Sequence, residues 1–492
     1  MGNKTLFIAL FSAITLFSNC KKEPKSGTPP PPPIGGGTIT EGTTNVEITR
    51  AQKFQTIDGF GFFGAQDVWW GSAANMYSDA WAELVLNDLG ITIWRDELHP
   101  PATATVPQDA DWTKHKPVVE GLVKVANQNK VPLKFIFTVW SPPASMKVAM
   151  DANREPISGT PNSGGTKGTG AAAGTLDPAK YTEFGNYLAD GIQLYKDAGA
   201  TIYAISPQNE PLFEQSFNSN SYKPSRYSEM LKNVVPVVKA RFPDVKIFGP
   251  ENMLEIEAEK DRQYFYGADL MKNPDALSKL DIWAYHGYLE GVSPTASSKL
   301  AALWNVINTE YTRPSGKPVW MTETSGYTES WLKNGAKPGA MDLAIDITSA
   351  LIYGNASAWV WWQGSAMDGI SEYTLMQGTT ATGTKYAASK HFYRFIRPGA
   401  KRLKLAFNAT DGVLGSAFEH TAMGAFTIVL INTSDKNMKV NLSGADLPAE
   451  YDFYFSTASD KCKKKEGKVG KDNIVLPKNS IVTLINGSFE EE

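Results

Sequence analysis

Cysteine is nearly absent from this chain of 492 residues, which contains only Cys20 and Cys462. Neither has a C-x-x-C neighbour, so the sequence predicts no zinc site. No disulfide pair is expected, because Cys20 ends a signal-like N-terminal segment. No cluster of histidine, cysteine and aspartate suggests a catalytic metal, and no Ser-His-Asp order is evident. We therefore expect neither a metal nor a cofactor.

Excess charge and long apolar runs are also missing. The formal net charge is −3, and the 48 lysine and arginine residues are spread along the chain, so nothing favours a nucleic-acid partner. No segment after the N-terminal region has about 18 consecutive apolar residues, so no transmembrane helix is expected. Gly59-Phe60-Gly61 lacks the third glycine of a dinucleotide-binding loop, which removes the main support for a doubly wound open sheet.

Apolar and aromatic residues are plentiful. Hydrophobic residues make up 42% of the chain, and the length suits one large barrel plus an accessory domain. Aromatic residues reach 11%. A large core could account for them, or several rings could line a sugar-binding cleft, because aromatic faces stack on the C–H faces of pyranose rings.

The N-terminus is typical of an exported protein. Lys4 precedes the short apolar run Leu6 to Phe17, which ends just before Cys20. Residues 1–20 resemble a bacterial lipoprotein signal with Cys20 as the lipidated residue, although Asn19 departs from the usual small residue and ordinary signal cleavage is the alternative. Residues 21–43 form a Pro- and Gly-rich linker that favours an extended spacer. We expect a monomer at the cell surface or in the periplasm, attached to the outer membrane only through its lipid, or else secreted.

Short apolar runs alternate with amphipathic stretches over residues 44–397, which predicts a (β/α)8 barrel. Residues 44–52 could instead pair with the side domain. The helix expected after Asp177-Pro178 has an apolar face at spacings of three and four residues, with Gly199 as its cap. The eight candidate strands are Phe54–Phe62, Ile91–Glu97, Leu133–Trp140, Ile202–Glu210, Lys246–Pro250, Asp281–Gly287, Val319–Glu323 and Ala358–Trp362.

Residues 398–492 lose the helical periodicity and show alternation and turns instead. Phe426 to Ile431 and Ser480 to Ile485 are examples. This pattern predicts a β-sandwich side domain of about eight short strands. The lysine cluster Lys461 to Lys465 is expected to be a solvated loop.

The fourth and seventh candidate strands end in Glu210 and Glu323. Active sites of such barrels lie at the C-terminal ends of the strands, so both carboxylates would meet at the barrel mouth. Retaining glycoside hydrolysis needs this pair, one as proton donor and one as nucleophile, about 5–5.5 Å apart. A single glutamate at a strand end would be weak evidence, because helix caps and rim ion pairs are common; the pair is more specific.

The chain resembles glycoside hydrolase family 30 from about Phe54 to its C-terminus. The resemblance rests on four segments, Gln55 to Gly61, Ala204 to Pro211, Trp320 to Glu323 and His391 to Gly399. It implies that Glu210 is the acid/base and Glu323 the nucleophile. It also implies that the β-sandwich packs rigidly against the barrel.

Further site residues are expected at other strand ends. Asn209 could hydrogen-bond the sugar 2-OH or simply cap a turn, and Arg95 could hold Glu323 ionised or pair with Asp96 or Glu97. Tyr288 could orient the nucleophile. The remaining substrate-binding candidates are His286, which a core position would also explain, Trp140, and one of Trp361 and Trp362, because successive strand residues point opposite ways.

The loops after the strands bear on the substrate. Xylanases of the family that read a glucuronic acid branch carry an arginine after the eighth strand, whereas Gln363 to Tyr373 has no arginine and two acids. Trp140 to Lys147 and the insertion Ser158 to Gly174 resemble the xylanase branch. We expect an endo-acting enzyme on xylan. The alternatives are a β-1,6-glucanase, a β-1,6-galactanase, a glucosylceramidase-like enzyme, or a non-catalytic glycan-binding lipoprotein; an adhesin would leave the glutamate pair unexplained.

Overall fold

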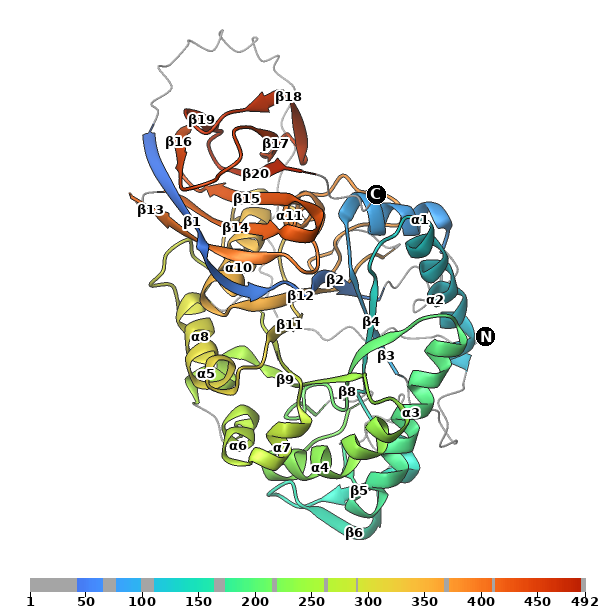
Figure 1. Cartoon of the computed structure of the whole chain (residues 1–492). Helices are drawn as coiled ribbons and strands as arrows, with labels where there is room; N and C mark the ends of the chain where they lie inside the picture. The colour runs from blue at the N-terminus through green and yellow to red at the C-terminus, as the bar shows by residue number, and fades with distance from the viewer. Residues whose placement is uncertain are drawn as a thin grey trace, which may run out of the picture. The chain divides into compact units, whose positions relative to one another are not determined.

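A computed structural model describes residues 42–64, 77–98, 110–162, 173–214, 219–260, 264–288, 291–366, 371–408 and 412–487. Its centre is a closed barrel of eight parallel strands, in the spatial order β10-β11-β12-β2-β3-β4-β8-β9 (Figure 1). The strands are β2 (Gly59–Phe63), β3 (Ile93–Glu97), β4 (Lys134–Thr138), β8 (Ile202–Ser206), β9 (Lys246–Met253), β10 (Ile282–His286), β11 (Val319–Glu323) and β12 (Ala356–Trp362). All eight predicted strands are present, and the barrel is confirmed.

The barrel interior is packed with side chains rather than open. Small residues such as Ala204 and Ala284 alternate with bulky ones such as Phe248 and Trp320, all almost fully buried. The indole of Trp320 donates to Asp58 Oδ2 at 2.9 Å, near the N-terminal ends of the strands. The interior therefore fixes the strand ends that carry the candidate site.

Helices cover the outside of the barrel. Asp177 accepts from the backbone N–H of Ala179 and Pro178 follows it, so the predicted helix start is correct; a short 3₁₀ turn (Pro178–Lys180) precedes the α-helix. Gly199 has φ +82°, the left-handed conformation expected of a cap. The helices are α1 (Asp79–Glu83), which continues as a π-helical segment (Leu84–Leu89), α2 (Ala110–Gln128), α3 (Tyr181–Asp197), α4 (Pro224–Arg241), α5 (Leu254–Glu259), α6 (Tyr266–Lys272), α7 (Pro274–Lys279), α8 (Lys299–Ile307), which continues as a second π-helical segment (Asn308–Thr312), α9 (Arg313–Ser315), α10 (Ala340–Tyr353) and α11 (Thr384–Tyr393).

The side domain is one mixed nine-stranded sheet with a hydrophobic core of its own. Its strands are β1 (Gly42–Thr56), β13 (Lys401–Phe407), β14 (Val413–His420), β15 (Ala425–Asn432), β16 (Met438–Ser443), β17 (Tyr451–Ser456), β18 (Lys463–Val469), β19 (Ile474–Leu476) and β20 (Ser480–Asn486). The predicted β-rich side domain is therefore present, with eight strands after residue 398 and β1 added to them.

Strand β1, from the N-terminal part of the chain, pairs with strands of the C-terminal side sheet. It lies between β13, to which it is antiparallel, and β16, to which it is parallel (Figure 1). Residues 44–52 thus pair with the side domain, and two boundaries need correction. The linker predicted to reach residue 43 gives way to strand at Gly42, and the candidate strand Phe54–Phe62 is two strands, because Thr56 still pairs with Lys401 and the barrel strand begins only at Gly59.

Buried polar contacts join the barrel to the side sheet, and the two cluster into one compact unit. His391 on α11 lies 2.6 Å from Thr483 Oγ1 and 2.8 Å from Ser456 Oγ, both on the side sheet. Burial lowers the pKa of His391 to about 3, so the ring stays neutral and the contact does not titrate near neutral pH.

Two smaller features complete the described fold. Strands β5 (Lys147–Met150), β6 (Pro156–Pro161) and β7 (Thr175–Leu176) form a small sheet in the connection after β4, and short 3₁₀ turns lie at Ala144–Met146 and Thr421–Met423. Within the described ranges, no helix has both the length and the apolar character to cross a membrane.

The lysine cluster is not a loop as predicted, because Lys463 to Lys465 begin the exposed edge strand β18. Charge on an edge strand discourages pairing with other chains.

Candidate active site

Glu210 lies in the loop that follows β8, at the C-terminal end of the barrel. The backbone N–H of Asn209 donates to Val139 O at 2.8 Å, and Gln208 Nε2 donates to Trp140 O at 2.9 Å. These bonds hold the loop against the segment after β4. Glu210 itself adopts the left-handed φ of +41°, a conformation that costs energy for a side chain other than glycine and is typical of functional positions.

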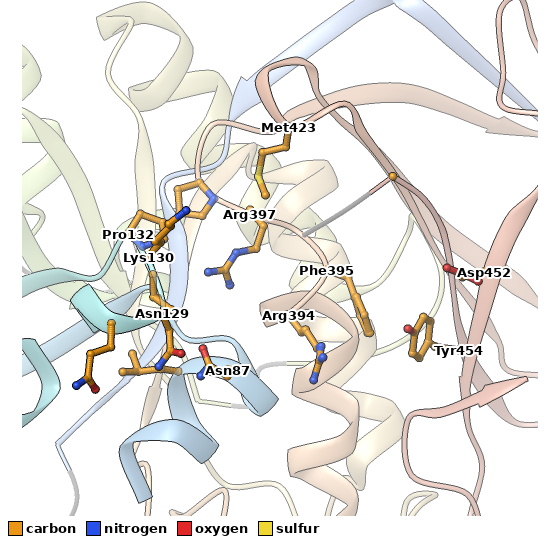
Figure 2. Close-up of a pocket in the computed structure, with 15 residues that line it drawn as sticks. Asn87, Asn129, Lys130, Pro132, Arg394, Phe395, Arg397, Met423, Asp452 and Tyr454 are labelled. Carbon is orange, nitrogen blue, oxygen red and sulfur yellow. The ribbon is translucent and has the colours of Figure 1, made fainter. Parts of the chain in front are cut away.

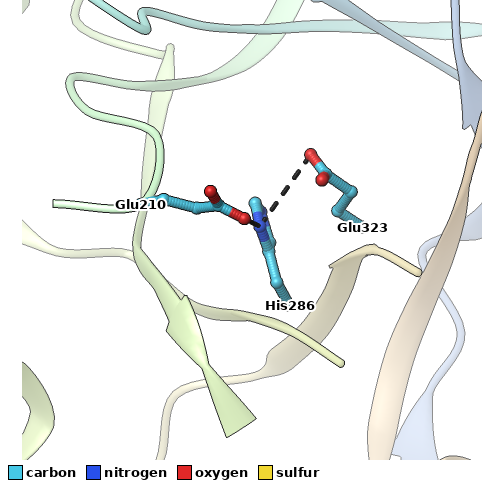
Figure 3. A group of neighbouring side chains, drawn as sticks. All are labelled: Glu210, His286 and Glu323. Carbon is cyan, nitrogen blue, oxygen red and sulfur yellow. Dashed lines mark hydrogen bonds and ion pairs between the residues drawn. The ribbon is translucent and has the colours of Figure 1, made fainter. Parts of the chain in front are cut away.

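Glu323 is the last residue of β11 and pairs in register with His286 at the end of β10. Glu210 and Glu323 are only 7% and 6% exposed. One carboxylate oxygen of each, together with a ring nitrogen of His286, forms a group whose atoms all lie within 4.8 Å of one another (Figure 3). This separation fits the two carboxyl groups of a retaining glycosidase and leaves too little room for the water between them that inversion requires.

Arg95 on β3 holds the nucleophile candidate in place. Its guanidinium is fully buried and donates to Glu323 Oε2 at 2.8 Å and to Glu251 Oε1 at 2.9 Å. It also donates to Asn209 Oδ1 at 3.0 Å. Of the two alternatives in the sequence, Arg95 pairs with Glu323 rather than with Asp96 or Glu97. The guanidinium places a buried positive charge beside the carboxylate of Glu323, which also orients that side chain.

His286 and Tyr288 complete the contacts of the two glutamates. His286 Nδ1 lies 2.9 Å from Glu210 Oε1 and 3.8 Å from Glu323 Oε2, while Nε2 lies 3.4 Å from Glu251 Oε1. The hydroxyl of Tyr288 donates to Glu323 Oε1. Both carboxylate oxygens of Glu323 therefore accept from a fixed donor.

Burial and neighbouring charges shift the pKa values of Glu210 and His286. Burial raises the pKa of Glu210 above its ordinary value, the nearby charge of Glu323 raises it further, and the His286 hydrogen bond opposes both. Burial alone would lower the pKa of His286, but Glu323, Glu210 and Glu251 outweigh it and raise that pKa to about 9. A raised carboxyl pKa suits a proton donor.

Glu210, His286 and Glu323 present oxygen and nitrogen atoms of the kinds that also bind metal ions. Arg95 and Tyr288 already occupy both oxygens of Glu323, and a protonated His286 is a donor at both nitrogens. These contacts favour acid–base and nucleophilic roles for the three side chains over metal binding.

Comparison with known proteins agrees with this geometry. No family model matches the chain. Glucuronoxylanase XynC of Bacillus subtilis (strain 168) is 24% identical over 412 residues, which are 82% of this chain and 82% of that protein. Among solved structures, the glycoside hydrolase family 30 subfamily 8 xylanase Xyn30A from Clostridium acetobutylicum superposes with a TM-score of 0.69 at 22% identity, covering 90% of this chain and all of that one. The endo-beta1,6-glucanase BT3312 gives a TM-score of 0.69 at 18% identity, covering 91% and 94%.

The chain shares its fold with solved enzymes of glycoside hydrolase family 30. The four segments that carry the sequence resemblance lie in or next to β2, β8, β11 and α11.

Aromatic side chains form one wall beside Arg95. The guanidinium lies 5.0 Å from the ring centroid of Trp140 and 5.5 Å from that of Phe63, and the Trp362 ring stacks on Phe63 at 4.3 Å. Trp140 and Trp362 thus belong to the mouth. Trp361 does not, because it is fully buried in the main core and its indole donates to Tyr373 O at 2.8 Å.

Glu251 is the site residue that the sequence reasoning missed. It lies within β9, beyond Pro250, where the apolar run ends, and is fully buried. Burial would raise its pKa, but Arg95 and then His286 outweigh burial and lower it to about 2. Its place after an apolar run on a barrel strand was the available signal. Asn209 has its oxygen engaged by Arg95, so its Nδ2 is the atom that would meet a sugar hydroxyl.

The loop after β12 is described in part. Glu372 forms an ion pair with Lys337 at 3.1 Å, so that acid is partly neutralised, while Asp368 lies outside the described residues, as do Cys20 and most of the insertion Ser158–Gly174. Cys462 is buried and unbridged.

A cavity of about 660 Å³ lies elsewhere, lined by residues such as Asn129, Arg394 and Tyr454 (Figure 2). It adjoins Pro132, just before the N-terminal end of β4, and neither Glu210 nor Glu323 is among its lining residues.

Proposed function

We propose that this protein is a retaining glycoside hydrolase that cleaves β-glycosidic bonds within a polysaccharide. The observation that carries the proposal is the buried pair Glu210 and Glu323, whose carboxylate oxygens approach within 4.8 Å at the barrel mouth. The contacts of the two differ. Glu323 accepts hydrogen bonds from Arg95 and Tyr288, while burial raises the pKa of Glu210.

The reaction follows from these contacts. In the first step Glu323 attacks the anomeric carbon, and Glu210 gives its proton to the departing glycosidic oxygen. In the second step a water attacks the same carbon and passes a proton to Glu210, and Glu323 leaves as a carboxylate. Asn209 Nδ2 would donate to a substrate hydroxyl, and the Trp140 and Trp362 rings would contact a sugar face.

Xylan is the first candidate substrate. The supporting observation is the likeness to a curated glucuronoxylanase and to a solved family 30 xylanase over most of the chain. A β-1,6-glucan is the second candidate, because an endo-1,6-β-glucanase of Aspergillus fumigatus is 25% identical over 334 residues and a solved endo-β1,6-glucanase shares the fold. The absence of arginine from Gln363 to Tyr373 argues against dependence on a glucuronic acid branch.

The test is a product profile of the purified protein on xylan, glucuronoxylan, β-1,6-glucan, β-1,6-galactan and aryl glycosides, with Glu323→Ala as control. We expect one polymer to be cleaved to short oligosaccharides, and the activity to vanish in the control. Binding to a polymer with no cleavage of any of them would favour a non-catalytic glycan-binding protein instead.

A second experiment separates the roles of the two glutamates. Glu210→Ala should impair cleavage of natural linkages far more than of activated aryl glycosides, whose leaving groups need little protonation. Azide should partly restore the second step. An equal loss on both kinds of substrate would contradict the acid/base role of Glu210.

We also propose that the protein is exported and anchored by a lipid on Cys20, acting as a monomer. The support is the short apolar run before Cys20 and the Pro-rich stretch after it. Labelling with a fatty-acid analogue should mark the wild-type protein and not Cys20→Ala. Release of the wild type into the medium without label would favour ordinary secretion.

A further inference from the structure

Three carboxylates surround the imidazole of His286, from three different strands or strand ends. Glu210 and Glu323 face Nδ1, at 2.9 Å and 3.8 Å, and Glu251 faces Nε2 at 3.4 Å. The ring is fully buried. Arg95 also bridges Glu251 and Glu323. Orienting the proton donor Glu210 would not by itself require three carboxylates around one imidazole.

The reaction moves a negative charge from one side of His286 to the other. In the free enzyme Glu323 is the carboxylate and Glu210 carries the proton. When the glycosyl ester forms on Glu323, that charge is lost there, and Glu210, having given its proton to the leaving oxygen, becomes the carboxylate. His286 Nδ1 is near an oxygen of each, so a protonated ring would face the negative charge in both states.

We propose that Glu251 is a positioning residue whose permanent negative charge keeps His286 protonated through both halves of the reaction, so that one fixed cation serves the carboxylate of Glu323 and then that of Glu210. The proposal rests on the proposed retaining function. The site then contains two cations, Arg95 and His286, and two anions in each state, so its net charge does not change as the intermediate forms.

Glu251 is the suitable anchor because its charge does not take part in the chemistry. Arg95 donates to its Oε1 at 2.9 Å, and the same oxygen faces His286 Nε2. When Glu323 is esterified, His286 loses the neighbour that contributes most to its raised pKa, and Glu251 is the anion that remains on Nε2. Among the described residues, further titratable groups around the ring and its carboxylates are Arg95 from β3, Tyr288 after β10 and Tyr227 on α4, none of which supplies a negative charge at neutral pH.

The experiment follows the ring directly by ¹⁵N NMR of histidine-labelled protein. The chain has five histidines, and His286→Gln identifies the signal of interest. In wild-type protein at pH 7 both ring nitrogens of His286 should have protonated shifts. They should keep those shifts after a 2-fluoro glycoside reagent traps the glycosyl ester on Glu323. A neutral ring in either state would overturn the proposal, and this comparison needs no variant at Glu251.

Glu251→Gln then tests the anchor. We expect the proton affinity of His286 to fall at least about tenfold in the free variant, and the ring to be neutral at pH 7 in its trapped ester. Glu257→Gln is the matched control, because Glu257 is also fully buried but bonds Asn252 and the backbone N–H groups of Tyr266 and Gly267. An unchanged His286 titration in Glu251→Gln would refute the anchoring role. Failure of the reagent to trap any ester would count against the proposed function, and the titration of the free enzymes would still decide the role of Glu251.

Discussion

Replacing Arg95 with methionine should destabilise the fold strongly at neutral pH and much less in acid. The substitution keeps a long apolar stem but removes a fully buried charge that bonds Glu323, Glu251 and Asn209. Two carboxylates would then lie buried with His286 as the cation beside them. An uncompensated buried charge, rather than the lost hydrogen bonds, is expected to dominate the effect.

Two estimates of the unfolding free energy lost in Arg95→Met describe the same buried interaction. Removing one partner of a buried ion pair typically costs about 3–5 kcal/mol. The environment of Glu251 lowers its pKa from 4.5 to about 2, which corresponds to about 3 kcal/mol of linked stability. Because the folded pKa is depressed, this stability is fully present above pH 4.5 and is lost as the pH falls toward 2. The cost of Arg95→Met should therefore be about 3–5 kcal/mol at pH 7 and distinctly smaller near pH 3.5.

Urea unfolding of wild type and variant at both pH values measures this difference. Arg402→Met is the matched control, because Arg402 is also buried but donates to the neutral acceptors Gln55 Oε1 at 2.9 Å and Asn355 Oδ1 at 2.7 Å. Its cost should be similar at the two pH values. A loss below about 1 kcal/mol for Arg95→Met, or an equal loss at both pH values, would refute the reasoning.

Three further outcomes are expected. Tyr288→Phe removes a donor to Glu323 and should lower kcat/KM about 10- to 100-fold without moving the thermal midpoint. Trp361→Ala should cost about 3–5 kcal/mol of unfolding free energy, whereas Trp362→Ala should mainly raise KM. Burial raises the pKa of Asp346 to about 7, so wild-type stability is lost as pH rises from 3.8 to 7, and Asp346→Asn should be more stable at pH 8 by up to about 4 kcal/mol but not at pH 3.5.

Each of these three predictions would be contradicted by a specific result. A lowered midpoint in Tyr288→Phe would mean that the hydroxyl supports the fold rather than Glu323. Equal effects of the two tryptophan substitutions on unfolding would place both rings in the core. A constant difference between wild type and Asp346→Asn across that pH range would mean that Asp346 does not titrate there.

The barrel could be predicted from sequence because its strands are buried on both faces and stand out as short apolar runs. The boundary at Phe54 to Gly59 could not. Both β1 and β2 are extended, and Phe54 near the end of β1 lies only a few residues before the apolar strand β2, so nothing in the sequence marks a break at Ile57-Asp58. Only the pairing of Thr56 with Lys401, far away in the sequence, shows that the first part belongs to another sheet.

The site was predictable to the extent that strand ends converge. Glu210 and Glu323 were found because each ends an apolar run at the face where barrel enzymes keep their active sites. Alternation along β12 predicted that one of Trp361 and Trp362 faces inward, but which one depends on register. Glu251 also follows an apolar run on a barrel strand, but its role depends on contacts with Arg95 and His286 on other strands, which that local pattern does not show.

The position of β1 means that the side domain is not a contiguous module. Deleting residues 398–492 would leave both edges of β1 without their partners β13 and β16, and an unpaired strand of this length invites association with other chains. The transplantable unit is residues 42–56 together with 398–487. Grafting this sheet onto another barrel would therefore require two junctions, one on each side of the catalytic segment, as for a domain inserted within another.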